Sequence, residues 1–247
     1  MNEHQAGRVQ PIDDRPAVIF LIIIVAMALT PIVAGFVGAT LSGTRLAPYS
    51  AAFAVLAQEV VLAGATLWRL KALGVPISSL RLLVDEAQIA LSGLAGGGVL
   101  LVTNVLSSQI SALFFDALLG AERLAEWLAR EQASVRRLFD PDVDTLQLGL
   151  MVFLAVGIAP FVEELFFRGY AYPVLKRHLG RHAAWVSALL FAAVHLYVIN
   201  FLPIFLIGLL LARLYERTGA LAVPILAHAT ANGAVAILAI WLQRWAG

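Results

Sequence analysis

The stretch APFVEELFFRG, Ala159–Gly169, is the most informative part of the sequence about the fold. It places two carboxylates and an arginine within the apolar run Leu146–Leu175. A helix of that length extends about 45 Å, which exceeds the roughly 30 Å of hydrocarbon in a bilayer. The run therefore predicts a membrane-spanning helix. Ionisable residues at membrane depth are costly, so Glu163, Glu164 and Arg168 are candidates for a functional site.

Further apolar stretches on both sides of this run are long enough to cross a bilayer with some tilt. They are Ala17–Leu41, Ser50–Leu67, Ala87–Leu113, Ala183–Ile199, Phe201–Leu214 and Leu221–Leu242. The two stretches that flank Asn200 are short, so they form either two tightly joined helices or a partly re-entrant segment. We therefore predict an all-α fold, a polytopic transmembrane helical bundle of about seven spans, or eight.

The composition agrees with a membrane protein. The chain is 61% hydrophobic and 13% charged, whereas soluble domains carry about 25% charged residues. The absence of cysteine excludes disulfides and thiolate metal sites. A net charge of +1 gives no argument for a nucleic-acid partner. The lipid bilayer is the partner that the composition implies.

The N-terminus is polar before the first apolar run begins. Residues 1–16 include Arg8 and Arg15, as a signal peptide would, but Ala17–Leu41 is too long for an h-region of roughly 7–15 residues. We expect a retained first span. Residues 1–16 are then a short mobile tail, and 17–247 form a single integral membrane domain.

Lysine and arginine residues are unevenly distributed between the two sides of the predicted bundle. A cytoplasmic N-terminus places ten of them in cytoplasmic segments and six on the other side, as the positive-inside rule favours. Four of those six lie in the loop Gly120–Thr145. This loop contains AERLAEWLAREQASVRRLF, Ala121–Phe139, whose apolar residues recur at helical spacing opposite charged ones. We expect an amphipathic helix at the membrane interface, with anchoring as its role.

Two glycines in the third span have a spacing that favours close helix contacts. Gly93 and Gly97 stand four residues apart in SGLAGGGVL, Ser92–Leu100. This small-xxx-small register lets two transmembrane helices approach closely. We expect these glycines to serve packing.

The charged residues of the stretch Ala159–Gly169 lie on different sides of the predicted helix. Successive helical residues are separated by about 100°, so Glu164 and Arg168 lie within roughly 40° of each other and are expected to pair. Glu163 points about 140° away from Arg168, which leaves its carboxylate as a candidate general base or ligand. Pro160 removes a helix hydrogen bond and is expected to loosen the backbone beside Glu163.

Two later spans supply further polar side chains. His195 ends the sequence FAAVH, and His228 and Asn232 lie one turn apart in HATAN. Measured from the basic loop at residues 176–181, Glu163 and His195 both lie roughly 20 Å along their helices, and His228 lies roughly 11–15 Å along its own. Each residue alone is explained by a hydrogen bond between helices, but their convergence favours function. For Glu59 we expect a structural role.

These motifs have a family resemblance. Glu-Glu-x-x-x-Arg, Phe-x-x-x-His and His-x-x-x-Asn occur in that order, as EELFFR, FAAVH and HATAN. The set resembles the CPBP (CAAX protease and bacteriocin-processing) intramembrane endopeptidases. The resemblance covers about Leu146 to Ile240 and implies that 146–240 form a catalytic four-span core.

The resemblance also implies roles for the residues. Glu163 and His195 would polarise the attacking water. His228 and Asn232 would steady the oxyanion or help to hold a metal, and Glu164 with Arg168 would support them. The substrate would be a peptide or a membrane protein, for example a prenylated C-terminal peptide or a leader peptide.

Two questions stay open at this point. Glu163, His195 and His228 are acceptable zinc ligands, and a metal-free Glu163–His195 pair is about equally consistent with the motifs; no HExxH is present. The alternative to a protease is a non-proteolytic membrane protein, such as a transporter or an immunity factor, that uses the polar cluster to bind an ion, a proton or a partner.

Overall fold

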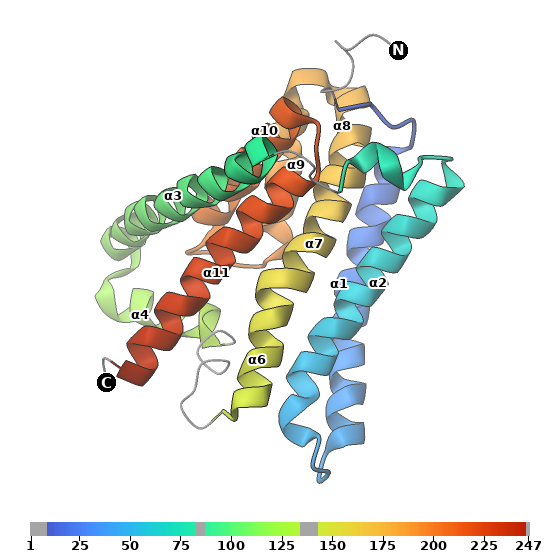
Figure 1. Ribbon diagram of the computed structural model, residues 1–247. Coiled ribbons are helices and arrows are strands. Elements are labelled where there is room, and N and C mark those ends of the chain that lie inside the picture. The colour runs from blue at the N-terminus through green and yellow to red at the C-terminus, as the bar shows by residue number, and fades with distance from the viewer. Residues whose placement is uncertain (1–8, 83–86, 134–142, 246–247) are drawn as a thin grey trace.

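The computed structural model describes residues 9–82, 87–133 and 143–245. Within these ranges the chain is helical and contains no strand (Figure 1). Five segments are long and apolar enough to cross a membrane: Pro16–Leu41, Ala47–Ala72, Ala90–Leu119, Thr145–Val194 and Ala222–Leu242. The predicted helical membrane bundle is therefore confirmed, and the protein is an integral multi-pass membrane protein.

The element order follows the predicted spans, with some shifted ends. The helices of the first half are α1 (Pro16–Leu41), α2 (Ser50–Ala72), α3 (Ala87–Leu119) and the short α4 (Ala121–Glu131). Those of the second half are α6 (Thr145–Phe153), α7 (Ala159–Glu164), α8 (Tyr172–Leu179), α9 (Ala183–Val194), α10 (Phe201–Thr218) and α11 (Ala222–Trp245). In Figure 1, α1 and α2 lie side by side, and α3 lies against α11.

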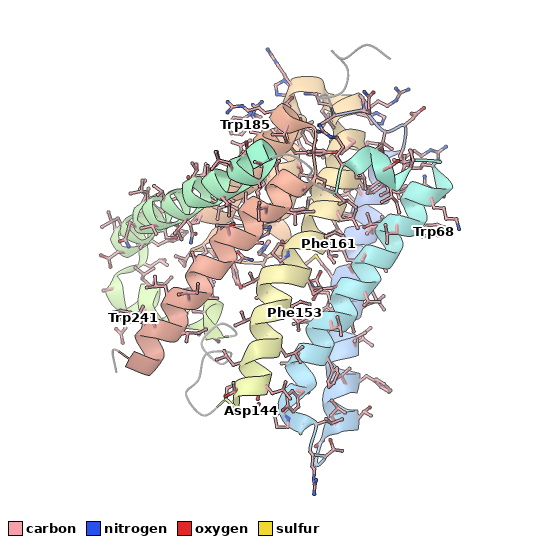
Figure 2. All side chains as sticks on the ribbon, in the orientation of Figure 1. Trp68, Asp144, Phe153, Phe161, Trp185 and Trp241 are labelled. Carbon is pink, nitrogen blue, oxygen red and sulfur yellow. The ribbon has the colours of Figure 1, made fainter. Side chains whose placement is uncertain are left out.

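Large apolar side chains cover the outside of the bundle. Trp68 on α2, Phe153 on α6 and Trp241 on α11 are exposed, and Trp68 and Trp241 lie on opposite sides of the bundle in Figure 2. Exposed apolar surface of this extent is unfavourable in water but not in lipid. The outer surface therefore suits a bilayer.

Helices α6, α7 and α8 form one continuous helical run. The segments that join them, Leu154–Ile158 and Leu165–Ala171, are π-helical. Such wider turns accommodate a proline that cannot donate a backbone hydrogen bond, so the loosening expected beside Pro160 takes this form. Glu163 lies about 27 Å from Thr145 and about 24 Å from Leu179 at 1.5 Å per residue. It is therefore near the middle of the run.

Helix α9 is shorter than the predicted span Ala183–Ile199. It ends at Val194 after 12 residues, about 18 Å, which is too short to cross the hydrocarbon. Leu196 then has a left-handed φ of 57°, and a loop leads to α10. The predicted boundary was wrong because the backbone N–H groups of this loop bind a side chain of α4 instead of continuing the helix.

The N-terminal segment is attached to the bundle in its described part. Asp14 accepts hydrogen bonds from Arg69 Nε at 2.8 Å, Arg69 Nη2 at 2.5 Å and the Tyr170 hydroxyl at 2.6 Å. The Arg69 guanidinium holds the pKa of Asp14 at about 2, below its ordinary value of 3.8. The prediction of a mobile tail is therefore wrong for residues 9–15, because the buried carboxylate of Asp14 forms a salt bridge with Arg69 on α2.

The glycines of α3 permit its close contact with α11, as predicted. A Cβ on Gly93 would lie 2.7 Å from a Leu226 methyl carbon, and one on Gly97 would lie 2.5 Å from the Thr230 Cβ. Both distances are shorter than carbon atoms tolerate without movement. Gly98 differs, because a Cβ there meets no atom within 4 Å.

This contrast provides a matched test. We expect Gly97→Val to lower the free energy of unfolding by about 1–3 kcal/mol, the usual cost of overpacking. Gly98→Val gains the same helix propensity and collides with nothing, so its stability should not fall. Unfolding of the purified variants in detergent measures the difference. Equal stabilities of the two variants would contradict the packing role of Gly97.

Candidate active site

Glu164 and Arg168 form the predicted ion pair inside the long helical run. Arg168 Nη1 donates to Glu164 Oε1 at 2.8 Å, and both side chains are fully buried. Arg168 Nη2 donates to the carbonyl oxygen of Gly208 on α10 at 2.8 Å. The guanidinium carbon also lies 4.7 Å from the centroid of the Phe191 ring, a cation–π distance. The pair thus joins the long run to α9 and α10.

His228 contacts this ion pair. Its Nδ1 lies 3.0 Å from Glu164 Oε1, so Glu164 bridges Arg168 and His228. The motifs predicted that His228 would lie with Glu163, but its hydrogen-bond partner is Glu164. Neighbouring helical residues point about 100° apart, and α11 packs on the side of the run that carries Glu164.

Asn232 supports the π-helical turn before Pro160. Its Nδ2 donates to the carbonyl oxygen of Ala155 at 2.9 Å. In the i→i+5 pattern of a π-helix, that carbonyl would accept from residue 160, and proline has no N–H. The amide of Asn232 supplies the missing donor. This contact was not predicted, because it depends on the π-helical hydrogen-bond pattern.

Glu163 and His195 lie on the wall of one cavity. The cavity has a volume of about 440 Å³ and lies among α1, α2, the long run and the end of α9; most of its lining is apolar. Glu163 Oε2 is buried and has no hydrogen-bond partner among the described residues. The structure therefore brings Glu163 and His195 to one cavity, whereas His228 and Asn232 are outside the lining of this cavity.

The hydrogen bond of His195 determines which ring nitrogen is basic. His195 Nδ1 lies 2.7 Å from the carbonyl oxygen of Phe191. A carbonyl only accepts, so Nδ1 carries the proton and donates, and in the neutral ring Nε2 is the basic nitrogen. The position of His195 directly after the last turn of α9 makes this contact available.

Glu59 belongs to the same cavity. It lies on α2, is 4% exposed, lines the cavity beside Gln58, and its Oε2 has no hydrogen-bond partner among the described residues. Its carboxyl group is near enough to Glu163 for the two to interact electrostatically. From the sequence we expect a structural role for Glu59, although an ionisable residue within a span is itself a signal for function.

The three side chains that the sequence suggested as metal ligands, Glu163, His195 and His228, do not gather in one place. Within residues 9–82, 87–133 and 143–245, no group of three or more His, Asp or Glu side chains is arranged to bind a metal ion. Glu163 and His195 share the cavity, but His228 is bound to Glu164 outside it. The described residues therefore do not fit a zinc site made of Glu163, His195 and His228.

Comparisons with known proteins support the resemblance seen in the motifs. The family model of the "Type II CAAX prenyl endopeptidase Rce1-like" proteins matches residues 145–234. "Uncharacterized protein YpbD" of Bacillus subtilis (strain 168) is 40% identical over 82 residues, which cover 32% of this chain and 39% of that relative. No solved structure matches. The match supports the CPBP (CAAX protease and bacteriocin-processing) family for residues 145–234, which include Glu163, His195, His228 and Asn232.

Proposed function

We propose that this protein is an intramembrane endopeptidase in which Glu163 and His195 activate the water that hydrolyses a peptide bond. The match to a CAAX-type protease family supports proteolysis at the level of the family. The observation that carries the residue assignment is the cavity that Glu163 and His195 both line. Residues 146–240 are then the catalytic core.

The chemistry needs a base for the attacking water. Glu163 takes a proton from the water while the water oxygen attacks the carbonyl carbon of the peptide, and His195 Nε2 accepts the second hydrogen bond of the water. The same proton passes from Glu163 to the leaving nitrogen as the C–N bond breaks. The mostly apolar wall of the cavity excludes other water and strengthens these interactions.

The tetrahedral intermediate also needs hydrogen-bond donors. We propose His228 and Asn232 for this role, which requires the substrate carbonyl to reach α11. His228 would donate from Nε2, since its Nδ1 lies against Glu164 Oε1. Asn232 uses one N–H on Ala155 and keeps the second for the substrate.

We propose that the substrate is a peptide or a segment of a membrane protein, and that it enters from the bilayer. The cavity wall supports this, since α1 and α2 contribute apolar side chains to it, among them Ile23, Met27 and Leu62. Prenylated C-terminal peptides, leader peptides and transmembrane segments all have the required apolar character.

We propose a cytoplasmic N-terminus as well. The ten-to-six distribution of Lys and Arg supports it. The ion pairs Asp14–Arg69, Asp13–Arg177 and Lys176–Glu216 join the start of α1 and the ends of α2, α8 and α10 at one end of the bundle. The basic segments assigned to the cytoplasm therefore lie on the same side.

The test of the function is a comparison of peptide termini in membranes that contain the native protein or the Glu163→Gln variant. New termini should appear only with the native protein. Because we propose no step through a metal, a zinc chelator should leave these termini unchanged, and their loss on chelation would replace the metal-free scheme. Identical termini with both proteins would instead favour the alternative, a non-proteolytic protein that binds an ion, a proton or a partner.

A further inference from the structure

One carboxylate of the interfacial helix binds the loop that follows His195. Glu131, the last residue of α4, accepts four hydrogen bonds. The Val198 and Ile199 amides donate to its Oε1 at 2.7 and 2.8 Å. The Asn200 amide and the Asn200 Nδ2 donate to its Oε2 at 3.1 and 2.7 Å. Three consecutive backbone N–H groups that converge on one carboxylate form an anion-binding nest.

The donors of this nest are available because the two flanking helices stop short of them. Helix α9 ends at Val194 and α10 begins at Phe201, so the amides of 198–200 have no helical acceptor. They also lie at the N-terminus of α10, where the helix dipole favours a negative charge. Without Glu131, these N–H groups would lie near the end of the bundle with no protein acceptor among the described residues.

A second contact holds the same loop from α3. The Ser111 hydroxyl donates to the carbonyl oxygen of Ile199, and Ser111 is buried. The loop is therefore held by side chains from two preceding elements, one on its N–H groups and one on a carbonyl. Leu196, with its left-handed φ, stands between these contacts and α9.

The loop determines where His195 can lie. Only two residues separate His195 from the first amide bound by Glu131, and the rings of His195 and Tyr197 are 6.2 Å apart. Leu196 lines the cavity next to His195. A shift of the loop therefore moves the last turn of α9 and the imidazole that ends it.

We propose that Glu131 is a positioning residue for His195, which acts by holding the loop 196–200 so that the His195 ring stays at the cavity. This proposal rests on the proposed function, in which His195 polarises the attacking water. It assigns α4 a role in the active site in addition to membrane anchoring. Glu131 itself touches neither the substrate nor the reacting atoms.

A graded set of variants tests the proposal. Asn200→Ala removes one of the four hydrogen bonds, Glu131→Gln removes the charge and some acceptor capacity, and Glu131→Ala removes all four. The control is Glu126→Gln, which removes a charge from an exposed position of the same helix. The assay uses a peptide that spans a cleavage site found in the comparison of termini.

We expect the smallest loss of kcat in Asn200→Ala and a larger one in Glu131→Gln. The largest loss, on the order of 100-fold, is expected in Glu131→Ala. KM should change by no more than about 3-fold, because uniform binding of the substrate is untouched. Glu126→Gln should retain the native kcat. Hydrogen–deuterium exchange of the amides 198–200 should accelerate in Glu131→Ala, while exchange in α10 and α11 stays as in the native protein.

The outcomes separate this proposal from the proposed function. Native kcat in Glu131→Ala, together with lost activity in Glu163→Gln, overturns the positioning role and leaves the function intact. Cleavage that survives Glu163→Gln overturns the function, whereas unchanged exchange at 198–200 in Glu131→Ala overturns the contact itself. If Glu131→Ala does not fold, Asn200→Ala is the test of the proposal. A native kcat together with native exchange of the amides 198–200 in that variant overturns it.

Discussion

Glu163→Gln is expected to reduce kcat for peptide cleavage by about 10²–10⁴-fold, the usual contribution of a general base. The amide has almost the same shape as the carboxylate but cannot take a proton from water. The measurement is cleavage of a peptide that spans an identified site, by purified protein in detergent or reconstituted in vesicles. Glu122→Gln, the same change at an exposed position of α4, should keep the native rate.

His195→Ala provides the second arm of this prediction. If Glu163 and His195 act on one water, the double variant should lose little more activity than the more severe single variant. Losses that multiply would mean that the two residues act independently. A Glu163→Gln protein that cleaves at the native rate would remove Glu163 from the mechanism.

Glu164→Gln is expected to destabilise the fold by about 3–5 kcal/mol, because it leaves the charge of Arg168 buried without its counter-ion. Arg168 is fully buried, and its guanidinium is fixed by the carbonyl of Gly208 and by the Phe191 ring, so it cannot move to water. The measurement is unfolding of the purified variant in detergent. The adjacent Glu163→Gln substitution is the matched control. Its stability should remain within about 1 kcal/mol of the native protein, since the buried Oε2 of Glu163 has no hydrogen-bond partner in the part of the chain that the structure describes.

A double variant distinguishes the loss of the pair from the loss of one carboxylate. Glu164→Gln combined with Arg168→Met removes both charges, and replacing a buried pair by apolar groups often costs little. The double variant should therefore be more stable than Glu164→Gln alone. A double variant that is less stable than either single variant would contradict a mainly electrostatic origin of the effect.

Features that lie along one helix could be predicted from the sequence. The Glu164–Arg168 pair follows from four-residue spacing, and the predicted pair is present at 2.8 Å. The close contact of α3 through Gly93 and Gly97 follows from the same periodicity. Apolar length predicted the spans. The C-terminal end of α9 and the docking of Asp14 were missed, because their causes lie on other elements.

The sequence by itself determined the class of the protein, the approximate spans, the buried ion pair and the set of motifs that carries the family resemblance. Only the tertiary structure decided that His228 binds Glu164, that Asn232 supports the turn before Pro160, that Glu59 joins Glu163 at the cavity, and that Glu131 holds the loop after His195. The physical reason is that the helical period sets directions only within one helix. Which helix lies in each direction depends on how the whole bundle packs.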